Sequence, residues 1–156
     1  MEGPPPAHGM PALDWPPAPL SIRHLETGKT EVRCLARRKW VALEPEEWVR
    51  QHVVHHLASA LGYPLGCMSL EHRLVLNGME RRADIVCFTT DRVPHLLVEC
   101  KAPAVALGQA ALDQAARYNL VLGVPTLLVT NGTHHVAYRI APDGQALPLA
   151  ELPPCP

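Results

Sequence analysis

The sequence predicts an α/β fold with a mixed central sheet. Two segments, 43–64 and 104–122, have the periodicity of amphipathic helices, three strand patterns lie between them, and two more strand patterns follow the second helix. Strands joined by tight turns pair antiparallel, whereas a strand that follows a helical crossover can join the same sheet in parallel. The order helix, three strands, helix, two strands therefore predicts one mixed sheet with helices packed against it.

The first helix carries start and stop signals. Pro45 lies early in the segment, Glu46 and Glu47 lie in the first turn, and Gly62 follows the end. Apolar residues recur every four positions and predict a buried face, formed by Val49, Val53, Leu57 and Leu61.

The three strands after this helix are predicted at 67–77, 81–90 and 94–101. Asn77-Gly78 separates the first two, and this dipeptide is favoured in two-residue hairpin turns. The second helix is rich in alanine, and the two strands that follow it are predicted at 125–132 and 134–140. The predicted inner stripe of that helix is Leu107, Ala111, Ala115, Tyr118 and Leu122.

Both ends of the chain are rich in proline and lack periodicity. Residues 1–20 are predicted to form an extended or disordered arm, and residues 141–156 a similar tail, around a folded body at 21–140. Within that body, residues 21–43 predict a hairpin that turns at Thr27-Gly28. The GKT at 28–30 does not make a phosphate-binding loop, because position 23 is arginine where that loop needs glycine.

Composition narrows the class of protein. With 156 residues, 47% hydrophobic and 19% charged, the chain is expected to form one globular domain. No apolar run is as long as a membrane span and no signal-peptide layout is present, so we expect a cytoplasmic protein without a membrane partner. Five cysteines without a C-x-x-C pair favour reduced thiols over disulfides or zinc. A net charge of −1 does not indicate nucleic-acid binding, although local basic clusters at 37–39 and 81–82 can hold phosphate.

Charged residues interrupt the most apolar strand, LLVECKAP at 96–103. Side chains alternate across a strand, so Glu99 and Lys101 share one face. Asp84 holds a similar position in the preceding strand, and pairing of the two strands would place it beside Glu99. Two carboxylates at the rim of a buried sheet repel each other, and a divalent cation such as Mg²⁺ would relieve that repulsion. The alternative is a plain ion pair between Glu99 and Lys101.

These residues resemble the signature of the PD-(D/E)XK nucleases: Asp84, then fourteen residues, then Glu99-Cys100-Lys101. Further segments resemble one branch of that superfamily, the N-terminal nuclease domain of the R subunits of type I restriction enzymes, including small stand-alone forms. They are PEEWVRQ at 45–51, GYP at 62–64, RRADIV at 81–86, LLVECKAP at 96–103, DQAARYN at 113–119 and LLVTNG at 127–132. The resemblance covers about 21–140 and implies a restriction-endonuclease-like fold.

The resemblance also implies roles for single residues. Asp84, Glu99 and the backbone carbonyl of Cys100 would bind Mg²⁺ or Mn²⁺, and Lys101 would be the catalytic lysine. A glutamate of the first helix would complete the metal site, with Glu47 favoured and Glu46 as the alternate. Gln114 and Tyr118 match the Q-x-x-x-Y motif of this branch and lie one helical turn apart, so both can face the site.

The function implied is metal-dependent hydrolysis of DNA phosphodiester bonds. Candidates for holding the DNA backbone are Arg81, Arg82, Arg117 and Lys39, and Glu71 is expected to pair with a nearby arginine rather than with the metal. No room for an ATP-driven motor exists in the chain, so motor or specificity subunits of a restriction system are expected partners, and oligomerisation stays open. The alternatives are a non-catalytic nucleic-acid-binding or assembly module that keeps the nuclease fold, and a nuclease for repair or junction cleavage.

Overall fold

The computed structural model describes residues 9–156, so the first eight residues of the predicted arm lie outside the described part. The chain begins with three short strands, β1 (Ile22–His24), β2 (Thr30–Cys34) and β3 (Lys39–Ala42), followed by helix α1 (Pro45–Ser59) and a single 3-10 turn at Leu65–Cys67. Strands β4 (Met68–Leu76), β5 (Met79–Phe88) and β6 (Pro94–Cys100) precede helix α2 (Gln109–Leu122). Strands β7 (Thr126–Thr130), β8 (His135–Ile140) and β9 (Ala146–Leu149) complete the fold.

The central sheet has six strands in the order β4-β5-β6-β7-β8-β9. Its neighbours pair antiparallel except β6 and β7, which run parallel because α2 carries the chain back between them. This mixed α/β architecture confirms the predicted order of helix, three strands, helix and strands.

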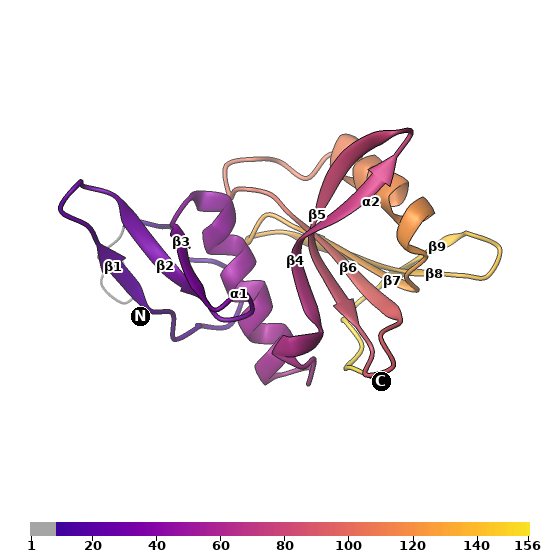
Figure 1. Ribbon diagram of the computed structural model, residues 1–156. Helices are drawn as coiled ribbons and strands as arrows, with labels where there is room; N and C mark the ends of the chain where they lie inside the picture. The colour runs from indigo at the N-terminus through magenta and orange to yellow at the C-terminus, as the bar shows by residue number, and fades with distance from the viewer. Residues whose placement is uncertain (1–8) are drawn as a thin grey trace.

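The two helices cover opposite faces of this sheet, as Figure 1 shows. Alternate residues of β6 separate the faces: Leu96 and Val98 pack in one core with α1, whereas Leu97 packs in another with Tyr118 of α2. The small sheet β1-β2-β3 lies beside α1 and shares a third, smaller core with Trp48.

Two sequence predictions about the ends of the fold need correction. Residues 21–43 form a three-stranded antiparallel meander instead of a two-stranded hairpin, because Lys39–Ala42 also pairs with β2. The tail at 141–156 contains β9, which pairs with β8, and Cys155 donates its backbone N–H to Leu61 at 2.8 Å. Proline interrupts the tail but β9 is an edge strand, where a missing N–H is tolerated.

The described part of the predicted N-terminal arm also contacts the body of the protein. Leu13 and Trp15 pack against the core on the α1 face. The Trp15 Nε1–H donates to Thr130 Oγ1 at 3.2 Å, and the Asp14 N–H donates to the Gly132 carbonyl at 2.8 Å. Residues 11–15 therefore belong to the folded structure.

The β4–β5 hairpin twists sharply in its middle. Glu71, in β4, has a φ of 51°, a left-handed conformation that costs a residue with a side chain about 1–3 kcal/mol. In the partner strand β5, Ile85 pairs with Leu70 and packs in the core with α1, while Ala83 pairs with His72 and packs in the core with α2. Strand β5 pairs with β6 only from Ile85 onward, so Asp84 lies where β5 diverges from β6.

Candidate functional site

The carboxylates of Asp84 and Glu99 meet where β5 and β6 separate. The Asp84 backbone N–H donates to Glu99 Oε1 at 3.2 Å, and the Cys100 N–H donates to Asp84 Oδ2 at 2.7 Å. Each carboxylate thus satisfies a backbone group that loses its ladder partner as the strands diverge. The prediction that Asp84 lies beside Glu99, based on strand alternation, agrees with this geometry.

Burial makes this pair of acids unusual. Only 3% of Glu99 is exposed, and burial together with the neighbouring Asp84 charge raises the pKa of Glu99 to about 9. Burial also raises the pKa of Asp84, although the Cys100 N–H hydrogen bond opposes that effect. At neutral pH the pair therefore retains a proton, in a position that a bound cation can take instead.

Lys101 lies at the end of a short chain of hydrogen bonds that leads into α2. Its Nζ donates to Gln114 Oε1 at 3.0 Å, and Gln114 Nε2 donates to the Tyr118 hydroxyl at 3.0 Å. Gln114 and Tyr118 are four residues apart and lie on the same side of the helix. The Lys101 amine is directed to Gln114 rather than into the alternative ion pair with Glu99, so its position depends on α2.

The donor set suits a hard divalent cation. Two carboxylates with further water ligands are a typical protein environment for Mg²⁺, which dehydrates reluctantly. Within residues 9–156, no three side chains of His, Cys, Asp or Glu form a metal-binding group by themselves. A metal held here would therefore rest on Asp84 and Glu99, with the Cys100 carbonyl and water completing the shell.

Comparison with protein families decides where this fold and site belong. Residues 45–153 match the family described as "Type I restriction enzyme R protein N terminus (HSDR_N)". The chain belongs to this family. The matched range spans α1, the whole central sheet and α2, and it includes every candidate site residue except Lys39.

One solved structure has the fold of this R-protein N-terminal domain, and a second aligns less well. A fragment of a candidate HsdR subunit of a type I restriction enzyme from Vibrio vulnificus YJ016 aligns with a TM-score of 0.54 at 22% identity, over 72% of this chain. The chain spans only 24% of the length of that fragment. A candidate nuclease of the DUF820 group from Anabaena variabilis ATCC 29413 aligns at a TM-score of 0.47 and 14% identity, over 83% of this chain and 80% of the other. No curated protein matches.

The two glutamates of α1 have different surroundings in this R-protein domain. Glu47, the favoured ligand, is buried and accepts hydrogen bonds from Arg37 at 2.6 Å, from Arg50 at 2.9 Å and from Gln51 at 3.1 Å. Burial alone would raise the pKa of Glu47, but these hydrogen bonds hold it below its usual range. Its oxygens are therefore occupied by the protein itself.

Glu46, the alternate, is exposed and lies close enough to Asp84 and Lys101 for their charges to act on it. Burial raises the pKa of Glu46, and the Asp84 charge raises it further, while Arg50 and Lys101 oppose the shift. Glu46, whose oxygens no other side chain of residues 9–156 occupies, is therefore the glutamate of α1 that we propose acts on the metal site through a bound water.

Sequence reasoning missed the arginine closest to the site. Arg50 Nη1 lies 3.6 Å from Asp84 Oδ1, and its guanidinium is almost fully buried beside Glu47. Burial alone would lower the pKa of Arg50, but Glu47 and Asp84 raise it, so the group stays charged. The sequence did contain a signal for it, because Arg50 lies one helical turn after Glu46 and so on the same side of the helix as that candidate ligand.

The predicted backbone-binding residues are more exposed. Arg82 Nη1 lies 3.6 Å from Glu71 Oε2, which agrees with the expectation that Glu71 pairs with an arginine. Arg81, Arg117 and Lys39 are exposed on β5, α2 and β3, and their role in binding DNA stays a prediction.

None of the helices in residues 9–156 is long and apolar enough to cross a membrane.

Proposed function

We propose that this domain is a metal-dependent DNA endonuclease that hydrolyses phosphodiester bonds. The observation that carries the proposal is the contact between half-buried Asp84 and buried Glu99, with Lys101 directly after the end of β6. A protein that only binds DNA has no need for a buried carboxylate in contact with a half-buried one, because each loses hydration and both repel phosphate.

Each candidate site residue would have a separate role in this reaction. Asp84 and Glu99 would hold Mg²⁺ or Mn²⁺, with the Cys100 carbonyl as a further ligand and Glu46 acting through a bound water. A divalent metal at this position supplies Lewis acidity and lowers the pKa of a bound water. Lys101 would place its ammonium against the scissile phosphate and stabilise the negative charge of the transition state. Gln114 and Tyr118 are positioning residues that fix the Lys101 amine.

Larger relatives suggest partners. The Vibrio vulnificus fragment is described as part of an HsdR subunit of a type I restriction enzyme and is about four times longer than the aligned region. By analogy, this domain would act within a restriction system together with motor or specificity subunits. Their absence from the assay would lower the rate without changing which residues are required.

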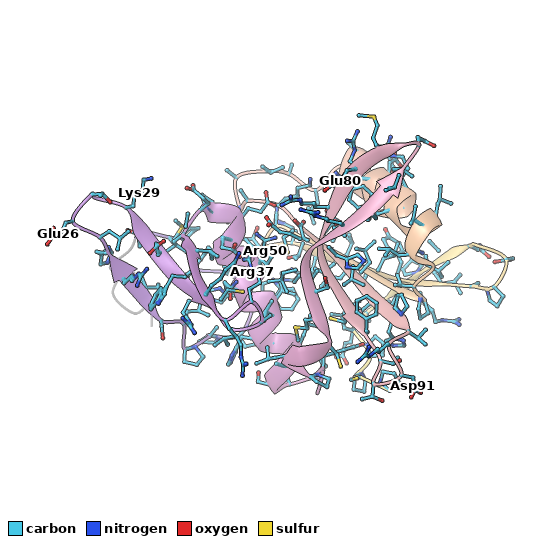
Figure 2. All side chains as sticks on the ribbon, in the orientation of Figure 1. Glu26, Lys29, Arg37, Arg50, Glu80 and Asp91 are labelled. Carbon is cyan, nitrogen blue, oxygen red and sulfur yellow. The ribbon has the colours of Figure 1, made fainter. Side chains whose placement is uncertain are left out.

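The test is cleavage of supercoiled plasmid and linear duplex DNA with Mg²⁺ or Mn²⁺. The variants Asp84→Asn, Glu99→Gln and Lys101→Ala keep the fold of the strand and remove one function each. Their matched controls are Asp91→Asn, Glu26→Gln and Lys29→Ala, which make the same chemical changes at exposed positions. Figure 2 shows these three residues far from Arg50, whose guanidinium lies 3.6 Å from Asp84.

Cleavage by the wild type and the three controls, with a loss of about 100-fold or more in the three site variants, supports the proposal. Equal cleavage by wild type and all three site variants would reject the assignment of the site. DNA binding without cleavage, even with partner subunits added, would favour the non-catalytic binding module. Preferential cutting of a four-way junction over duplex DNA would favour a junction nuclease.

A further inference from the structure

Glu71 lies among three arginines next to the Asp84–Glu99 pair. Arg37 comes from the turn between β2 and β3, Arg50 from α1 and Arg82 from β5. Their guanidinium nitrogens lie 3.8 Å, 3.7 Å and 3.6 Å from the Glu71 carboxylate oxygens. Three segments of the chain thus direct positive charge at one point on the surface.

These contacts are loose. Hydrogen bonds between guanidinium and carboxylate groups are usually about 2.7–2.9 Å long, and none of the three contacts is that short. The Glu71 side chain is 45% exposed. Glu47 differs, because the same Arg37 and Arg50 bind it at 2.6 Å and 2.9 Å in a buried position. Glu47 fixes the two guanidinium groups in place, while Glu71 is held only as a counter-ion.

The arginines are arranged to receive a second anion. Arg37 uses Nε on Cys34 Sγ and Nη2 on Glu47, which leaves Nη1 directed at Glu71. Figure 2 labels Arg37 and Arg50 at the centre of the molecule, close to α1. Because hydrogen bonds already hold both groups, little additional side-chain entropy is lost when an anion binds.

Glu71 is also kept in an unusual backbone conformation. Its φ of 51° lies in the left-handed region, which residues other than glycine rarely adopt. The residues on either side pair normally with β5, Leu70 with Ile85 and His72 with Ala83. A conformation of this kind within a strand is typical of a functional position, and here it places an acid in front of three arginines.

We propose that Arg37, Arg50 and Arg82 bind a phosphate of the DNA backbone next to the scissile one, and that Glu71 fills this site in the free protein. A phosphodiester carries one negative charge, as Glu71 does, so the exchange leaves the local charge unchanged. Guanidinium groups bind phosphate oxygens in the fork geometry that they use for carboxylates. The Arg50 guanidinium lies 3.7 Å from Glu71 and 3.6 Å from Asp84. A phosphate in the place of Glu71 would therefore share Arg50 with the proposed metal ligand Asp84.

This inference rests on the proposed DNA substrate, and binding without metal separates it from catalysis. Anisotropy of a fluorescent 20-mer duplex, measured in EDTA, would compare wild type with Glu71→Gln and Arg82→Gln. Both positions are well exposed, so folding should survive, and thermal unfolding would verify this. The controls are Glu80→Gln and Arg73→Gln, an exposed acid and base paired at 3.4 Å on the same hairpin.

Glu71→Gln should tighten DNA binding about fivefold, because a competing anion is removed. Arg82→Gln should weaken binding about fivefold and reduce the slope of log K against log salt by about one. The controls should stay within about twofold. Equal affinity of wild type and Glu71→Gln, or no binding by the wild type, would overturn the site. A response of Glu71→Gln to inorganic phosphate but not to the duplex would also overturn it, because the ligand would then be free phosphate.

Discussion

The buried acid pair predicts a specific loss of stability as pH rises in the absence of metal. The pKa of Glu99 is raised from its ordinary value to about 9, chiefly by burial and then by the Asp84 charge. Between those two values the folded protein holds a proton that the unfolded chain has released. The free energy of unfolding therefore falls with rising pH by about 1.4 kcal/mol per pH unit for one proton. The stabilisation is complete near pH 4 and disappears as pH approaches 9.

Urea denaturation in EDTA at pH 5, 6, 7 and 8 measures this effect in wild type and Glu99→Gln. Glutamine keeps the shape of the side chain and cannot titrate, so the difference between the two proteins isolates the acid pair. Contributions that do not involve Glu99 are the same in both proteins and cancel in this difference. The groups that surround Glu99 are Asp84, Lys101 and, through Asp84, Arg50 and Glu46.

We expect wild type to lose stability relative to Glu99→Gln by up to about 1.4 kcal/mol per pH unit over this range. Glu26→Gln, at an exposed turn, should show no such trend. Adding Mg²⁺ should remove most of the loss in wild type and none in Glu99→Gln, because a bound cation replaces the proton. A stability difference that stays constant from pH 5 to pH 8 would refute the account of the pair.

Three further predictions concern positions around the site and in the core. Tyr118→Phe removes a 3.0 Å hydrogen bond to Gln114, so single-turnover cleavage should slow several-fold while stability falls by only about 1 kcal/mol. Leu57→Ala should lower the free energy of unfolding by about 2–5 kcal/mol in urea, whereas Leu120→Ala, 81% exposed, should change it by less than about 0.5 kcal/mol. Gly132→Ala should destabilise more than Gly144→Ala in thermal unfolding; both have positive φ, but only at Gly132 would a Cβ meet Leu13 at 2.6 Å.

Local signals were enough to predict the central part of this fold. Asn77-Gly78 marks the β4–β5 hairpin, and the alternation along 97–101 agrees with the structure, where Leu97 packs with Tyr118 and Lys101 donates to Gln114 of the same helix α2. These features depend on neighbours in sequence or on one strand pairing. For the same reason the pairing of Asp84 with Glu99 could be inferred before any coordinates.

Features that depend on distant parts of the chain were not predictable in this way. β9 pairs at the edge of the sheet despite its proline, because β8 offers unpaired backbone groups there. Glu47 accepts hydrogen bonds from Arg37 only because the turn between β2 and β3 packs against α1, and that turn belongs to the small sheet. The three arginines around Glu71 come from three different segments, so their proximity can be recognised only in the folded structure.

Binding of Mn²⁺, followed by the electron paramagnetic resonance signal of the free ion, tests the central claim without DNA or partner subunits. The account predicts a Mn²⁺ site that Mg²⁺ displaces, that Asp84→Asn and Glu99→Gln each lose, and that Asp91→Asn retains. Undiminished Mn²⁺ binding in both site variants, or none in the wild type, would contradict it.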